Sequence, residues 1–294
     1  MQTEEIKDVD YNAPEWKELA EYERQQELKP PTPNNPPWNS LVAFGVWIFS
    51  VVMIAVVPAF FVLPYAAQQG IKLSDSLGLT EFLKNDSTAI LLQIIAVLPA
   101  HIFTLFLCWF VVTGYKRYSF RETLGWSQEN FRWYFYIIII VGFFSLAAIV
   151  GNFLPEQEND MIRLLRSSYA ATLAVAFLAT FTAPLVEEVV YRGVMYSAFQ
   201  RTFGVSGGVA LVTFFFALVH VPQYWGSPGT ILLICLLSLV LTLVRVKTDS
   251  LLPCIILHTI FNGIQSIFLV LSPYLPQNPA ETKEAVSTII NLFP

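Results

Sequence analysis

Long apolar runs separated by short polar stretches dominate the chain from residue 41 to residue 271. Most runs approach the roughly 20 residues that a helix needs to cross the hydrocarbon core of a bilayer. The pattern therefore predicts an all-α fold, a polytopic membrane helix bundle of about seven to eight transmembrane helices. We assign seven runs, at residues 41–63, 89–112, 134–154, 170–199, 207–221, 230–246 and 251–271. The fifth and sixth are short, so one of them is expected to be tilted, kinked or partly inserted.

Polar segments flank this apolar region on both sides. Residues 1–38 read as an acidic tail followed by a Pro-rich linker, PPTPNNPP at 30–37, which we expect to hold the tail off the membrane. The membrane domain is predicted over residues 39–272, and residues 273–294 form a short C-terminal tail.

Composition supports the membrane assignment. Of the 294 residues, 55% are hydrophobic and only 13% are charged, which is too apolar for a soluble domain of this length. The net charge of −5 gives no support for nucleic-acid binding. We therefore expect the lipid bilayer, and not a nucleic acid, as the surrounding partner.

Basic residues near the span ends predict the orientation. Nine lie on the N-terminal side and five on the other, so the N-terminus is expected in the cytoplasm. The first group is Arg24, Lys29, Lys116, Arg117, Arg121, Arg132, Arg201, Arg245 and Lys247; the second is Lys72, Lys84, Arg163, Arg166 and Lys283.

Three charged residues interrupt the fourth span, Glu187, Glu188 and Arg192. Each charge costs roughly 2.5 to 3.5 kcal/mol at the centre of a membrane helix, so such residues suggest a functional site. Glu188 and Arg192 are four residues apart and share a helix face, where they can form an ion pair. Glu187 points about 100° away and needs a partner from another helix. A purely structural ion pair is the alternative, but it requires only one carboxylate.

Two histidines and one asparagine are candidates for that partner. Glu187 lies 17 residues before Gly204 and His220 lies 16 after it, so a hairpin at this glycine would bring them to similar depth. His258 and Asn262, four residues apart on the seventh span, are predicted within about 5 Å of the same level. The remaining histidine, His101, is interpreted as a hydrogen-bonded core residue.

Such a group suits peptide hydrolysis, which needs a base for water and donors for the developing oxyanion. A zinc protease is an alternative, since two His and one Glu form a known catalytic zinc set, although no HExxH sequence is present. A non-enzymatic scaffold and a transporter with a proton relay also remain open.

Three short motifs in this region resemble those of the CPBP family of intramembrane proteases, which includes type II CAAX prenyl proteases and bacteriocin-immunity proteins. They are EExxxR at 187–192, FxxxH from Phe216 to His220, and HxxxN from His258 to Asn262. The resemblance covers about residues 170–272. It implies a metal-free glutamate-dependent endopeptidase with no cofactor.

The same resemblance implies individual roles. Glu187 would activate water with help from His220, and His258 with Asn262 would stabilise the oxyanion. Glu188 and Arg192 would support the arrangement. The substrate would be a peptide or protein, with prenylation and membrane attachment left open. The aromatic residues near His220 could line an apolar groove for a lipid or a hydrophobic segment, but they are expected mainly at the lipid and interfacial surface; these are Phe214, Phe215, Phe216, Tyr224 and Trp225.

Overall fold

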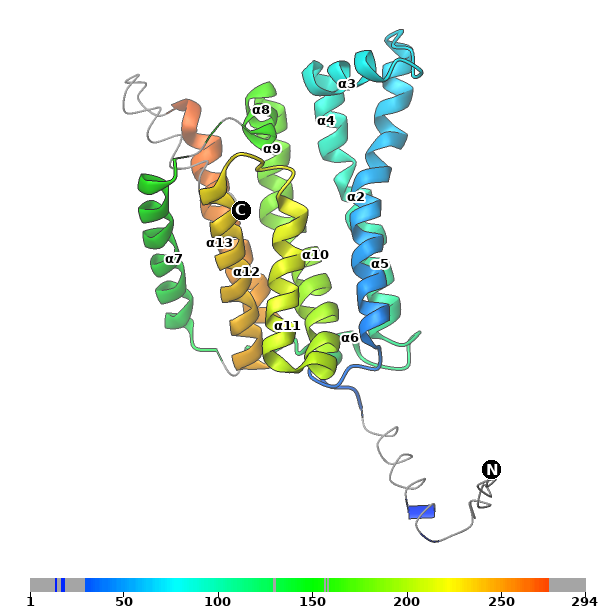
Figure 1. Ribbon diagram of the computed structural model, residues 1–294, viewed down its shortest axis with the longest axis vertical. Helices are drawn as coiled ribbons and strands as arrows, with labels where there is room; N and C mark the ends of the chain where they lie inside the picture. The colour runs from blue at the N-terminus through cyan, green and yellow to red at the C-terminus, as the bar shows by residue number, and fades with distance from the viewer. Residues whose placement is uncertain are drawn as a thin grey trace, which may run out of the picture. The chain divides into compact units, whose positions relative to one another are not determined.

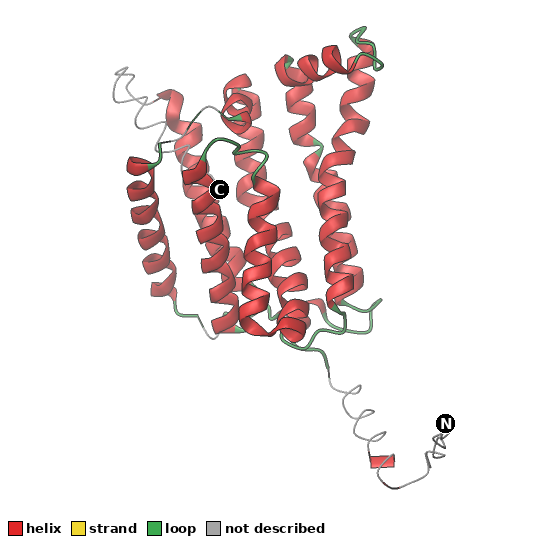
Figure 2. Ribbon diagram, viewed as in Figure 1, coloured by secondary structure: helices red, strands yellow, loops and turns green. Residues whose placement is uncertain are grey.

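The computed structural model describes residues 30–128, 131–155, 157 and 159–274, together with positions 14, 17 and 18. The chain divides into two compact units, Met1–Pro31 and Thr32–Pro294. Most of the predicted acidic tail and nearly all of the C-terminal tail lie outside the described residues. Within the described part, all regular elements are helices, which confirms the all-α membrane bundle (Figure 2).

Among the described residues, six helices are long and apolar enough to cross a membrane, by length and composition. They are α2 (Ser40–Gln68), the run Ser87–Val112 formed by α4 (Ser87–Ile95) and α5 (Val97–Val112), α7 (Trp133–Phe153), the run Tyr169–His220, α12 (Pro228–Thr248) and α13 (Leu252–Leu271) (Figure 1). Three shorter helices lie between them, α3 (Ser76–Asn85), α6 (Phe120–Leu124) and α8 (Asp160–Ser167), and the short η3 (Ser272–Tyr274) follows α13.

The run Tyr169–His220 contains the predicted fourth and fifth spans. Gly204 breaks it with φ 74° and ψ 170°, a conformation that favours glycine. Beyond this break the chain returns against itself, since a Cβ on Gly208 would lie 2.9 Å from the backbone nitrogen of Gln200. The predicted hairpin therefore exists, and dividing the run at Gly204 gives the seven apolar segments expected. The sixth segment is not short: α12 has 21 residues.

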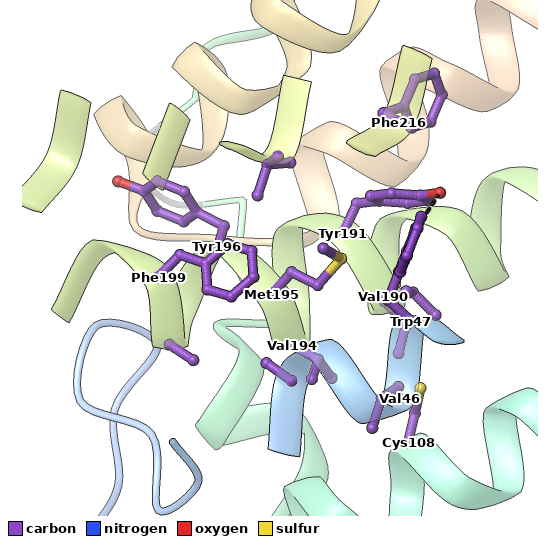
Figure 3. Packing of buried hydrophobic residues seen from close by; sticks show 14 of the residues in the cluster. Val46, Trp47, Cys108, Val190, Tyr191, Val194, Met195, Tyr196, Phe199 and Phe216 are labelled. Carbon is purple, nitrogen blue, oxygen red and sulfur yellow. Dashed lines mark hydrogen bonds between the residues drawn. The ribbon is translucent and has the colours of Figure 1, made fainter. Parts of the chain in front are cut away.

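Buried side chains from α2, α5 and the region around residues 186–217 form the main hydrophobic core (Figure 3). Trp47 of α2 reaches into this core and donates from Nε1 to the hydroxyl oxygen of Tyr191, at 3.1 Å. The Tyr191 ring packs edge-on against Phe216, with centroids 5.0 Å apart. A second core joins α7, α12 and α13. The first core includes residues of the glutamate-bearing helix, and α13 of the second core packs against that helix.

From Pro33 onward, the segment predicted as a Pro-rich linker is hydrogen-bonded to the bundle. Arg201 donates to the carbonyl oxygens of Pro36 and Trp38, at 2.7 and 3.0 Å. Arg245, which is fully buried, donates to the carbonyl oxygen of Pro33 at 2.7 Å. Proline removes backbone donors but leaves these carbonyls free to accept, so a sequence that cannot form a helix still binds tightly.

Trp38 anchors this segment in the core. Its side chain is 4% exposed and its Nε1 donates to the carbonyl oxygen of Val194 at 2.9 Å. This bond ties the segment to the helical region just after the glutamate pair.

The Trp38→Phe variant should lose at least about 1 kcal/mol of unfolding free energy, because it removes one buried hydrogen bond and replaces the buried indole by a smaller ring. Thermal unfolding in detergent would measure this. Trp133→Phe is the control, since Trp133 is 73% exposed at the start of α7. Equal unfolding midpoints for the two variants would contradict the anchoring role.

Candidate active site

Two widened helical turns bracket the glutamate pair. The π-helical segment η1 (Leu178–Thr182) precedes α10 (Ala183–Glu188), and a second, η2 (Val189–Met195), follows it. Pro184 occupies the first turn of α10, where its missing N–H does least harm. Single π-helical turns inside α-helices occur frequently at functional sites. Pro184 thus lies directly after a π-helical turn, one turn before the glutamates.

Glu188 and Arg192 form the predicted ion pair. Both side chains are 0% exposed, and Arg192 Nη1 donates to Glu188 Oε1 at 2.8 Å. The other guanidinium nitrogens donate to α12: Nη2 to the carbonyl and hydroxyl oxygens of Ser238 and Nε to the Thr242 hydroxyl, at 2.9 to 3.2 Å. The charged pair is therefore extensively hydrogen-bonded, as a buried ion pair must be.

Phe216 lies among the charged groups and not at the lipid surface expected for it. Its side chain is 1% exposed, and the Arg192 guanidinium carbon lies 4.7 Å from the ring centroid. The rings of His220 and His258 lie 4.8 and 6.1 Å from it, between centroids. Tyr224 is likewise buried, whereas Trp225 is 76% exposed, so the aromatic surface prediction was wrong for Phe216 and Tyr224. Phe216 and His220 of the FxxxH motif are four residues apart and share a helix face, so Phe216 faces the site together with His220.

His258 lies between the two glutamates. Its Nδ1 is 2.8 Å from Glu188 Oε1, and its Nε2 is 3.8 Å from Glu187 Oε2. An ionised carboxylate only accepts hydrogen bonds, so Nδ1 carries a proton there. Glu188 thus bonds both Arg192 and His258 through one oxygen, and this fixes the imidazole with Nε2 toward Glu187.

Asn262 lies one turn beyond His258 on α13. Its Nδ2 donates to the carbonyl oxygen of Ala179 in η1, at 2.9 Å. Its buried Oδ1 has no hydrogen-bond partner among the described residues. The second Nδ2 hydrogen remains available to a ligand in the site.

His220 is the last residue of α11 (Tyr196–His220) and lines the site. Its Nδ1 donates to the carbonyl oxygen of Phe216 at 2.7 Å, because a carbonyl can only accept. This bond leaves Nε2 as the nitrogen that can act on a ligand.

Two cavities of about 240 and 270 Å³ meet at Glu187. The residues that line both are Ile54, His101, Glu187, His220 and Gln223. His258 and Asn262 line the first. The side chain of Glu187 is 25% exposed, so this carboxylate faces open space while its neighbour does not.

The residues predicted for the site therefore come together, and two more line its cavities. His101 is hydrogen-bonded and 6% exposed, as expected, but it also faces both cavities. Gln223 lies in the turn after α11. Neither has a motif partner four residues away, so the sequence offered no signal for them.

Among the described residues, no group of three or more His, Cys, Asp or Glu side chains is arranged to hold a metal ion.

Comparison with known families matches residues 169–264 to the family described as type II CAAX prenyl endopeptidase, Rce1-like. The predicted resemblance is confirmed. The match begins at the start of the glutamate-bearing run and ends two residues after Asn262, so it contains all three motifs. It indicates a protease of the membrane. No curated protein and no solved structure gives a significant match.

The two adjacent glutamates should differ sharply in their effect on stability. Glu188→Gln leaves the Arg192 charge buried without its counter-ion, which should cost about 3 to 5 kcal/mol of unfolding free energy. Glu187→Gln changes a group that faces a cavity and should stay within about 0.5 kcal/mol of wild type. Unfolding of both variants in the same detergent provides the comparison, and a Glu187→Gln variant as unstable as Glu188→Gln would refute this division.

Proposed function

We propose that this protein is an intramembrane endopeptidase in which Glu187 activates a water molecule. The observation that carries the proposal is the difference between the two glutamates. Glu188 is engaged with Arg192 and His258, whereas Glu187 lies in a cavity with one oxygen 3.8 Å from the His258 ring. A base for hydrolysis must reach water, and of the pair only Glu187 is exposed to the cavity.

Charge balance supports this arrangement. The buried pair Glu188 and Arg192 is neutral as a unit. Glu187 and His258 are also neutral as a pair in two states. Either Glu187 is protonated and His258 is a neutral imidazole, or Glu187 is a carboxylate and His258 an imidazolium. A low-dielectric site strongly disfavours an uncompensated charge, so a neutral set is the form that a membrane can hold.

The hydrolysis then proceeds with every proton assigned. Glu187 takes a proton from a water molecule held at His220 Nε2, and the water oxygen attacks the scissile carbonyl. Protonated His258, through Nε2, and the Asn262 amide donate to the oxyanion. When the C–N bond breaks, Glu187 passes its proton to the leaving amine. Preorganised donors of this kind stabilise developing charge most effectively where water is excluded.

The substrate is proposed from the family description and from the cavity lining. The family acts on CAAX prenyl substrates by its description, and the cavities here carry apolar side chains such as Ile54, Val97 and Leu178. A prenylated peptide ending in a CAAX sequence is therefore the first substrate to test. We keep the N-terminus in the cytoplasm as a prediction.

Glu187→Gln in reconstituted full-length protein should reduce peptide cleavage by about 10²- to 10⁴-fold, the range for loss of a general base. The assay uses prenylated and unprenylated forms of one CAAX peptide. Glu122→Gln, at an exposed position of α6, is the control and should cleave at the wild-type rate. Wild-type cleavage by folded Glu187→Gln would exclude the proposed base.

Chelators should leave the activity unchanged, because no step of this mechanism uses a metal. The measurement is cleavage after treatment with EDTA and 1,10-phenanthroline, with elemental analysis of the purified protein. Activity lost with the chelator and restored by Zn²⁺ would replace this mechanism by a zinc protease.

A further inference from the structure

We infer that His101 contacts the bound peptide, accepting a hydrogen bond from a backbone N–H of the substrate, and that Thr182 orients it. This inference rests on the proposed function. It concerns a residue outside the three motifs, on α5, which packs beside the glutamate-bearing run.

The hydrogen bonds around Thr182 fix the His101 ring. His101 Nδ1 lies 3.0 Å from the Thr182 hydroxyl oxygen, and this hydroxyl donates to the carbonyl oxygen of Leu178 at 3.3 Å. The only hydroxyl hydrogen is used in the second bond, so the hydroxyl accepts from His101. Nδ1 therefore carries the proton, and Nε2 keeps its lone pair.

All three histidines of the chain follow one pattern. Nδ1 is bonded to Glu188 in His258, to the Phe216 carbonyl in His220, and to Thr182 in His101. A ring fixed through Nδ1 presents Nε2 as its working nitrogen. His101 is thus held in the same way as the two histidines that the proposed mechanism uses.

The position of Thr182 links His101 to the glutamates. Thr182 is the last residue of η1 and lies five residues before Glu187. It has φ −102°, away from the ideal helical value, where the widened turn meets α10. The ring of His101 is therefore attached to the same distorted turn that presents the base.

The cavities suggest what His101 binds. One cavity extends toward Ser50 and Val51 of α2, and the other toward Ala179 and the region around α13. An extended peptide that occupies both must pass the residues common to them, including Glu187 and His101. The backbone of such a peptide offers N–H donors, and a neutral imidazole with a free Nε2 accepts from one of them.

The test is steady-state kinetics of full-length reconstituted protein on the best CAAX peptide. His101→Ala should raise KM about tenfold with kcat nearly unchanged, since one hydrogen bond is made equally in the ground and transition states. His101→Gln, which retains an acceptor, should recover part of this loss. Phe106→Ala, whose side chain is 64% exposed on the same helix, should match wild type.

Thr182 variants separate orientation from packing. Thr182→Val removes the acceptor for His101 Nδ1 and should raise KM severalfold, while Thr182→Ser should not. The double variant His101→Ala with Thr182→Val should be no worse than His101→Ala alone, because both changes remove the same contact.

A wild-type KM in His101→Ala would overturn the inference. It would also be overturned if His101→Ala and His101→Gln lost activity equally and in proportion to the fall in their unfolding midpoints. If His101→Ala does not fold, the comparison of Thr182→Val with Thr182→Ser decides alone. Glu187→Gln in the same assay distinguishes the two proposals. If it is inactive while His101→Ala is normal, only the His101 inference fails; if it is active, the proposed function fails.

Discussion

The buried ion pair between Glu188 and Arg192 is the interaction on which the site depends. Two charges with no solvent exposure are tolerable only where nearby polar groups compensate them. Here α12 supplies Ser238 and Thr242 and α13 supplies His258, while Glu188 Oε2 has no partner among the described residues. Removing either charge would leave the other uncompensated in a membrane interior. The pair therefore locks three separate segments of chain into one geometry. The candidate active site is thus organised around one buried arginine and the groups that bind it.

This requirement also explains why two glutamates stand side by side. Glu188 cannot both neutralise Arg192 and exchange protons with water, because its side chain is fully buried against Arg192 and His258. Adjacent helix positions point about 100° apart, so the second carboxylate faces the cavities while the first stays in the core. His258 connects them, bonded to Glu188 and 3.8 Å from Glu187. Glu188 thus stabilises the buried arginine, while Glu187 is the carboxylate that faces the cavities.

Much of this organisation could be predicted from the sequence. The apolar runs gave the helices, the i,i+4 spacing gave the pair of Glu188 with Arg192, and counting from Gly204 brought His220 to the level of Glu187. Contacts between segments that follow no periodic sequence pattern could not be predicted. Carbonyl groups of the Pro-rich segment accept from Arg201 and Arg245, yet proline indicates only the absence of a helix. His101 depends on the distance between α5 and a π-helical turn, which residue spacing does not reveal.

The central claim is that Glu187 alone of the pair is open to solvent and required for cleavage. Reaction with a water-soluble carbodiimide, followed by peptide mass spectrometry and activity measurement on the same samples, tests it most directly. The account predicts modification at Glu187 and not at Glu188, with activity falling in proportion to the modified fraction. Modification at Glu188, or full activity after complete modification of Glu187, would contradict it.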